Sequence, residues 1–219
     1  MKKKIDIASP SLPRLMTFRN VSGLLSCIED RDDFHIRWLF HLDQYPGLEE
    51  DWEASLIDAC KAVPLFDDAL LFASKTNVGF GGVIHRLMSE VEQDVLWVED
   101  DWEWNGYFKL GDIQKAIADE GAYGFNFSFR REKIGAMRPA YWTHPMVQYL
   151  LSRWPASSLG MTEKKIKRRI MRGGKFINAR GASLMIPKSI CREVGGAYML
   201  AHGITCNHAG TVLCKTKLN

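Results

Sequence analysis

Three adjacent carboxylates follow an apolar run near the middle of this sequence. Glu99, Asp100 and Asp101 come directly after the segment VLWV, and Trp102 follows them. Adjacent carboxylates repel one another unless a cation or a positively charged partner compensates them. Mg²⁺ and Mn²⁺ prefer oxygen ligands, often one or two carboxylates together with substrate phosphates. The cluster therefore indicates a site for a divalent metal and a diphosphate, with a solvated loop as the alternative.

The elements around this cluster predict an α/β fold. Short apolar runs alternate with amphipathic segments, which favours a mainly parallel sheet flanked by helices on both faces. Strands are expected at 13–18, 34–43, 69–74, 94–100 and 123–129, and helices at 21–30, 48–63, 81–92, 111–121, 144–154 and 161–174. A strand followed by a short helix is expected over 182–196.

The loops that follow the predicted strands are expected to meet at one edge of the sheet. Ligands of open α/β sheets bind beyond the carboxyl ends of the strands. The segments that would gather there are TFRN (17–20), LDQYPG (42–47), SKTNVGFGG (74–82) and EDDWEW (99–104). The acidic cluster therefore belongs to the edge of the sheet that is expected to bind ligands.

Composition limits the classes of protein that this chain could represent. With 219 residues and 46% hydrophobic residues, one globular domain is expected over 1–219, with a nucleotide-binding half of about 1–110 and an acceptor-side half of 111–219. The net charge of +3 is too small to indicate a nucleic-acid or membrane partner by itself. The five cysteines form no CxxC pair, so reduced thiols in the cytoplasm are expected. No apolar leader follows the basic start, and no stretch predicts a membrane span.

The acidic segment resembles a motif of a known enzyme class. VLWVEDDWEWNGYF is similar to the Glu-Asp-Asp form of the DxD motif in nucleotide-sugar glycosyltransferases of the GT-A type, including family 2-like and N-acetylglucosaminyltransferase I-like enzymes. The resemblance implies a Rossmann-like GT-A sheet. It also implies that Asp101 binds Mn²⁺ or Mg²⁺, and that Glu99 and Asp100 line the nucleotide and the sugar.

Three further segments resemble the same family in the same order along the chain. LMTFRN is similar to the first strand and turn, FHLDQYPG to the second strand, and SKTNVGFGG to the Asn-x-Gly segment that precedes a helix. The nucleotide-sugar contacts that this resemblance implies are Thr17, Arg19, Asp43, Lys75, Asn77 and Gly79. From the residues alone, Asp43 is equally a turn residue before Tyr45-Pro46-Gly47, and the glycines could simply begin a helix.

Two later segments are similar to the family's catalytic and metal-binding segments. GMTEKKIKRRIMRGGKF resembles the one that carries the catalytic base, which makes Glu163 the candidate base, although Glu-Lys replaces the family's Glu-Asp. A single base implies inversion at the anomeric carbon; an acidic residue in the first turn of a helix is the alternative. HAGT resembles the late histidine of the metal site, which makes His208 a second ligand and His202 its substitute.

The basic run KKIKRRIMRGGK, at residues 164–175, indicates an anionic acceptor. The candidate acceptor contacts are Lys164, Arg168, Arg169 and the aromatic face of Trp102. Lys and Arg contacts to phosphate supply most nonspecific affinity for nucleic acids, and a solvated helix face is the alternative. DNA with hydroxymethylated bases and an anionic glycan both suit such a surface.

The sequence is therefore interpreted as a metal-dependent glycosyltransferase. It would move a hexosyl or pentosyl group from a nucleotide sugar, with UDP as the favoured nucleotide, to an acceptor hydroxyl, with a hydroxymethylated base in DNA as one candidate acceptor. A nucleotidyltransferase and a non-catalytic nucleic-acid-binding protein are the two rival interpretations. Oligomeric state is left open.

Overall fold

A computed structural model of the chain describes residues 2–127, 139–154, 168, 172–178, 182, 184–186 and 190–194. Seven of its strands form one sheet in the order β3-β2-β1-β4-β7-β6-β8, and β5 pairs with β9. The strands are β1 (Lys3–Ser11), β2 (Phe34–Asp43), β3 (Asp68–Ser74), β4 (Val95–Trp97), β5 (Trp102–Trp104), β6 (Gly124–Asn126), β7 (Ala140–Trp142), β8 (Phe176–Asn178) and β9 (Cys191–Glu193). The α-helices are α1 (Thr17–Cys27), α2 (Trp52–Cys60), α3 (Gly79–Ser89), α4 (Leu110–Asp119) and α5 (His144–Ser152), with short 3₁₀ turns at Arg31–Asp33 and Val63–Leu65.

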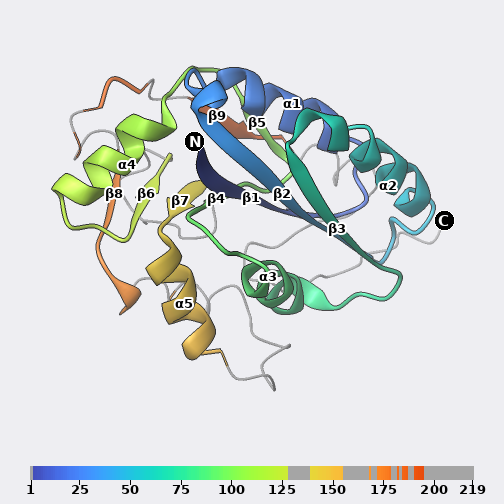
Figure 1. Cartoon of the computed structure of the whole chain (residues 1–219). Helices are drawn as coiled ribbons and strands as arrows, with labels where there is room; N and C mark the ends of the chain where they lie inside the picture. The colour runs from blue at the N-terminus through green and yellow to red at the C-terminus, as the bar shows by residue number, and fades with distance from the viewer. Residues whose placement is uncertain are drawn as a thin grey trace.

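The large sheet is mainly parallel. β1 pairs in parallel with β2 and β4, β2 pairs in parallel with β3, and β6 pairs in parallel with β8, whereas β7 is antiparallel to both of its neighbours. Strands from both halves of the chain thus join one sheet (Figure 1). The predicted fold class, a mainly parallel α/β sheet flanked by helices, is confirmed.

Helices cover both faces of the sheet. Apolar residues of α1, α2 and α4 share one core cluster with one face, and those of α3 and α5 share another cluster with the opposite face (Figure 1). Adjacent residues of β4 alternate between the clusters, so Leu96 packs with the first and Trp97 with the second. Trp97 stacks on Trp142 of β7 with ring centroids 5.3 Å apart. Such burial on both faces explains why β4 reads as a continuous apolar run.

The predicted strand at 13–18 is wrong. The first strand is instead β1, which pairs with β2 from Lys3 to Ser11, and helix α1 already begins at Thr17. The basic start and Pro10 disguise this strand, because proline is unfavourable within central strands. The ladder between β1 and β4 ends at Ala8, so the missing N–H of Pro10 interrupts no pairing with β4.

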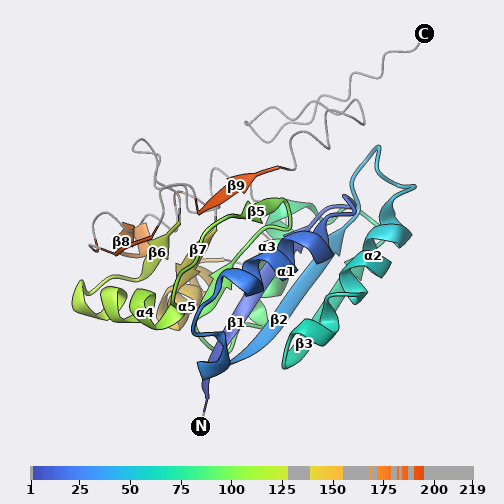
Figure 2. The same ribbon diagram turned by 90° about the horizontal axis from the view of Figure 1, so that it is seen from above.

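The prediction for 182–196 is also wrong where the structure describes that segment. Residues 184–186 lie outside any strand, and Cys191–Glu193 forms β9 where a helix was expected. β9 pairs with β5, and this small ribbon lies beside α1 (Figure 2). The helices predicted at 21–30, 48–63, 81–92, 111–121 and 144–154 agree with α1, α2, α3, α4 and α5 to within a few residues at each end. The predicted helix at 161–174 is described only at 168 and 172–173, which are helical.

Three helices receive their N-terminal cap from an aspartate that is distant in sequence. The carboxylate of Asp43 accepts the backbone N–H of Val78 at 2.9 Å and that of Gly79 at 3.1 Å, at the start of α3. Asp30 caps α4 in the same way, and Asp94 caps α5. Since the residues at the N-cap positions of these helices make no side-chain cap, the strands and their loops supply the acceptors.

Within the described ranges, no helix combines the length and the apolar character that crossing a bilayer requires. Of the cysteines found there, Cys27 and Cys60 are free thiols.

Candidate functional site

The acidic pair lies at the topological switch point of the sheet. From β1 the chain proceeds outward through β2 and β3, and then returns to place β4 on the other side of β1. Asp100 and Asp101 come three and four residues after the end of β4, and the N–H of Asp100 bonds to the carbonyl of Pro10 at 3.5 Å. Crevices at such switch points, outside the carboxyl ends of the strands, are where open α/β sheets bind ligands.

A buried arginine from the loop between β1 and α1 holds both aspartates. Arg14 Nη2 donates to Asp100 Oδ1 at 3.0 Å, and Arg14 Nη1 donates to Asp101 Oδ2. Arg14, Asp100 and Asp101 are exposed by only 7%, 1% and 6%. The guanidinium is therefore the positively charged partner that the adjacent carboxylates need. Sequence reasoning missed Arg14, although the charge argument required such a partner.

Asp100 is anchored by further donors. Its Oδ2 accepts from Ser11 Oγ and from Thr17 Oγ1, the latter at 3.3 Å, and Asn20 Nδ2 donates to its carbonyl at 2.6 Å. Burial raises the pKa of Asp100, and the nearby charge of Asp101 raises the pKa of Asp100 further. Arg14 and the two hydroxyls oppose this rise. Both carboxylate oxygens of Asp100 are thus engaged inside the protein.

One carboxylate oxygen of Asp101 makes no hydrogen bond to the described residues. Its Oδ1 and the Nε of Arg14 are both buried and find no hydrogen-bond partner among the residues that the structure describes. Burial lowers the pKa of Arg14, but Asp100 and Asp101 raise it by more, so the pKa stays above its ordinary value and the group stays charged. The ion pair of Arg14 and Asp101 consequently has one unpaired acceptor, Asp101 Oδ1, and one unpaired donor, Arg14 Nε, among the described residues.

This donor set fits a divalent cation that takes most of its ligands from elsewhere. Mg²⁺-type ions use one or two protein carboxylates and complete their shell with substrate phosphates and water. Asp101 Oδ1 supplies one such oxygen. The described ranges contain no group of three or more His, Cys, Asp or Glu side chains suited to a metal. His208, the other predicted ligand, lies outside the described residues.

The loop that carries Arg14 is held in a strained conformation. Leu15 has φ of 46°, a left-handed value that is uncommon for a residue with a branched side chain. Its N–H donates to Ser55 Oγ at 3.3 Å, and the N–H of Phe18 donates to Asp58 Oδ2 at 3.0 Å. These bonds to α2 fix the turn that directs Arg14 at the acidic pair, as expected where strain is retained at functional sites.

The residues that follow Asp100 and Asp101 are less exposed to solvent than the sequence suggested. Trp102 is only 7% exposed, and its indole N–H donates to Glu99 Oε2 at 3.3 Å. Glu103 bonds to Arg192 Nε at 2.7 Å and also to Arg19, whose side chain is 77% exposed. Glu99 and Trp102 thus lie beside the site, while Arg19 reaches outward to β5.

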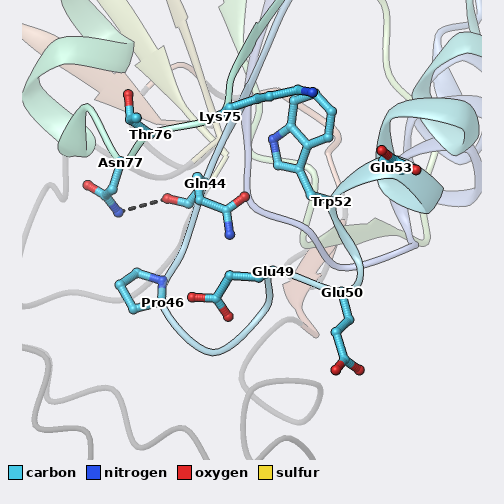
Figure 3. A pocket seen from close by; sticks show the side chains of 9 residues that line it. All are labelled: Gln44, Pro46, Glu49, Glu50, Trp52, Glu53, Lys75, Thr76 and Asn77. Atoms are coloured by element: carbon cyan, nitrogen blue, oxygen red, sulfur yellow. Dashed lines mark hydrogen bonds between the residues drawn. The ribbon is translucent and has the colours of Figure 1, made fainter.

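A pocket of about 780 Å³ opens at the carboxyl ends of β2 and β3 (Figure 3). Asn77 Nδ2 donates to the carbonyl of Gln44 at 2.8 Å, and Lys75 Nζ lies 5.5 Å from the centroid of the Trp52 ring. The indole of Trp52 is fixed by a 3.1 Å bond to the carbonyl of Ser74. The residues that line the pocket are Gln44, Pro46, Glu49, Glu50, Trp52, Glu53, Lys75, Thr76 and Asn77.

Apart from Arg19, Glu99 and Trp102, the predicted site residues fall into three groups. Thr17, Asp100 and Asp101 form one cluster around Arg14. Asp43 and Gly79 are joined by a hydrogen bond, with Lys75 and Asn77 in the neighbouring pocket, and burial raises the pKa of Asp43 although three backbone N–H groups oppose the rise. Four predicted residues, Glu163, Lys164, Arg169 and His208, lie outside the described residues, and Arg168 is described only as an exposed helical residue.

Comparison with known proteins gives a likeness of fold. The sequence matches no protein-family model and no curated protein. Residues 1–349 of S. aureus TarS are similar in structure with a TM-score of 0.62 at 10% identity, covering 92% of this chain and 63% of that one. A mannosyltransferase of Pyrobaculum calidifontis in complex with GDP-Man and Mn²⁺ has a TM-score of 0.57 at 12% identity, covering 89% and 57%.

The same TarS segment in complex with UDP-GlcNAc is also similar, with a TM-score of 0.52 at 10% identity over 81% of this chain and 55% of that one. The chain thus spans less than two thirds of the length of each of these proteins. At such low identity the likeness establishes the fold.

Proposed function

We propose that this chain is a glycosyltransferase that uses a nucleotide-sugar donor, with a UDP-sugar as the favoured donor. The observation that carries the proposal is the position of Asp100 and Asp101 at the switch point, at the same carboxyl edge of the parallel strands as the pocket at β2 and β3. The bound UDP-GlcNAc and GDP-Man of the structural neighbours support the donor class. A GT-A-like domain over 1–219 and a cytoplasmic location are parts of the same proposal.

The residues at the switch point have separate roles in this proposal. Asp101, whose Oδ1 is unpaired among the described residues, would hold Mn²⁺ or Mg²⁺, an ion that would supply positive charge to the diphosphate of the donor. In the ligand-free protein, Asp100 is fixed by Ser11 and Thr17 and holds the Arg14 that also pairs with Asp101. The family resemblance implies Glu99 and Asp100 as donor contacts, and Asp100 would have to give up one of its internal hydrogen bonds to serve as one.

The pocket is the proposed place of the nucleoside. Trp52 offers a partly exposed aromatic face there, and aromatic faces stack well on bases. Lys75 and Asn77 lie on the same rim, while Asp43 and Gly79 shape it by closing the start of α3. Thr17 and Arg19 complete the predicted donor contacts from α1.

On the acceptor side, Glu163 is the proposed base, which takes the proton of the attacking hydroxyl in an inverting reaction. Lys164, Arg168 and Arg169 are the proposed contacts for an anionic acceptor, either DNA with hydroxymethylated bases or an anionic glycan. His208 is the proposed second metal ligand. Trp102 would have to contact the acceptor through the small part of its ring that is exposed.

Thermal unfolding in the presence of nucleotides tests the proposal. UDP, GDP, CDP and ADP are added with and without Mn²⁺ to the wild type and to Asp101→Asn. A ligand that binds the native state raises the midpoint, so one diphosphate should stabilise the wild type only with Mn²⁺ and should not stabilise the variant. The matched control is Asp119→Asn, which removes an exposed carboxylate of α4 and should keep the response.

Product analysis separates the rival functions. A glycosyltransferase incubated with its nucleotide sugar releases a nucleoside diphosphate, whereas a nucleotidyltransferase releases pyrophosphate from a nucleoside triphosphate. A non-catalytic nucleic-acid-binding protein shows neither product, and its binding should survive Asp101→Asn but not charge-neutral changes at Lys164, Arg168 and Arg169. Absence of any nucleotide response in the wild type would refute the proposal.

A further inference from the structure

Arg14 occupies the place that a cation would need at the acidic pair. Its two terminal nitrogens each bind a different carboxylate, with side-chain exposures of 8% for Arg14, 0% for Asp100 and 9% for Asp101. A guanidinium in this arrangement is a fixed cation, because it stays charged at every accessible pH. The ligand-free protein therefore already carries a counter-ion for Asp101.

A divalent cation on Asp101 Oδ1 would lie beside the guanidinium on Oδ2, and the two positive charges would repel each other. Both would bind oxygens of one carboxylate, in surroundings where burial weakens the screening between charges. Asp100 cannot relieve the conflict, since Arg14, Ser11 and Thr17 already engage its two oxygens. Charge repulsion therefore weakens the binding of a dication at Asp101 as long as Arg14 stays on that carboxylate.

We infer that Arg14 is an intramolecular competitor of the divalent cation, which must displace it from Asp101 to bind tightly. The inference rests on the proposed function for the identity of the cation. A nucleoside diphosphate offers phosphate oxygens that an arginine binds well, so the donor gives the displaced guanidinium a new partner. The metal then binds weakly to the free protein and tightly together with the diphosphate. Arg14 acts as a positioning residue that couples the two ligands.

The loop around Arg14 is built to hold this competing state. Leu15 keeps its left-handed φ of 46°, and the loop is pinned to α2 through Ser55. The buried Nε of Arg14 finds no acceptor in the part of the chain that the structure describes. Arg14 thus binds both carboxylates but keeps one unsatisfied donor. This unsatisfied donor lowers the cost of moving Arg14 away from the carboxylates.

Direct titration with MnCl₂ in the absence of nucleotide tests the inference. Free Mn²⁺ is measured by electron paramagnetic resonance with wild type, Arg14→Met and the double variant Arg14→Met/Asp101→Asn. Removal of the competitor should tighten Mn²⁺ binding by about tenfold or more, and the double variant should lose this gain. The thermal midpoint of Arg14→Met should also rise with Mn²⁺ by more than that of the wild type.

The matched control is Arg37→Met. Arg37 is a second arginine that pairs with a buried aspartate of β1, Asp6, through bonds of 2.8 and 3.0 Å, but Asp6 lies in the first half of that strand, away from its carboxyl end. Its removal should leave Mn²⁺ affinity unchanged. If Arg14→Met folds only with Mn²⁺, that rescue supports the inference, and Arg14→Lys gives a second measurement.

Lysine keeps the charge but cannot bridge two carboxylates with a planar fork, so Arg14→Lys should tighten Mn²⁺ binding by a smaller factor. Mn²⁺ affinity at or below the wild-type value in both Arg14 variants would overturn the inference, as would a gain that persists without Asp101. These readings need no donor or turnover. If no nucleotide stabilised the wild type, the proposed function would be refuted. The Mn²⁺ titration would still show whether Arg14 competes with the cation for Asp101.

Discussion

Replacement of Asp43 by alanine should destabilise the protein through helix α3. The change removes the acceptor of two backbone N–H groups, those of Val78 and Gly79, and Asp43 is only 3% exposed, so water replaces it poorly. Loss of an N-cap costs about 0.5–2 kcal/mol, and a buried group left unsatisfied costs about 1–3 kcal/mol. Relief of the buried charge, which burial disfavours enough to raise the pKa of Asp43, offsets part of this loss. We therefore expect a net loss of about 2–3 kcal/mol in the free energy of unfolding.

Urea unfolding followed by far-UV circular dichroism measures this loss. Asp30→Ala is the matched comparison, because Asp30 caps α4 through two bonds of 2.8 Å to Leu110 and Gly111. Both variants should be destabilised to a similar extent. Only Asp43→Ala should also weaken nucleotide binding if Asp43 lies at the nucleoside. An Asp43→Ala variant within about 0.5 kcal/mol of the wild type would refute the capping argument.

Three further results are expected from single substitutions. Burial, and to a smaller extent the charge of Arg86, lower the pKa of His41 from its ordinary 6.5 to about 4. Between these two pH values the unfolded chain binds a proton that the folded chain does not, so stability should fall as the pH drops from 6.5 to 4. The loss from this group is up to about 3 kcal/mol, so unfolding free energies at pH 7 and pH 4.5 should differ less in His41→Asn than in the wild type, and equal differences would contradict this origin. Arg37→Met, which leaves buried Asp6 without its main partner, should cost about 3 kcal/mol in the same urea assay, and a loss below about 1 kcal/mol would show that the pair contributes little. Thr17→Val keeps the shape of the side chain but removes a donor to Asp100, so it should cost about 1–2 kcal/mol; a midpoint equal to that of the wild type would mean that Ser11 alone satisfies Asp100.

The part of the fold that follows from the sequence is the part with strong local patterns. The apolar run of β2 and the spacing of α3, α4 and α5 each identify an element, because burial on one or two faces leaves a period in the sequence. β1 escaped because its first residues are basic and it contains Pro10. Its place between β2 and β4 is fixed by partners that are distant in sequence.

The candidate site shows the same division. Asp100 and Asp101 could be found from three adjacent carboxylates after a buried strand, and the charge argument called for a positive partner. That this partner is Arg14 depends on contacts across 86 and 87 residues, which no local spacing encodes. The cap from Asp43 to α3 is hidden in the same way. Its predicted contact with the base stays a prediction.

The caps that reach from the loops to the helices also have a consequence for how the chain folds. α3, α4 and α5 begin with N–H groups whose acceptors, Asp43, Asp30 and Asp94, lie elsewhere in the sequence. Each first turn can therefore reach its full protection against hydrogen exchange only after distant segments have come together. Helix starts and sheet assembly become one cooperative event, and peptides cut out as single helices should fray at their N-termini.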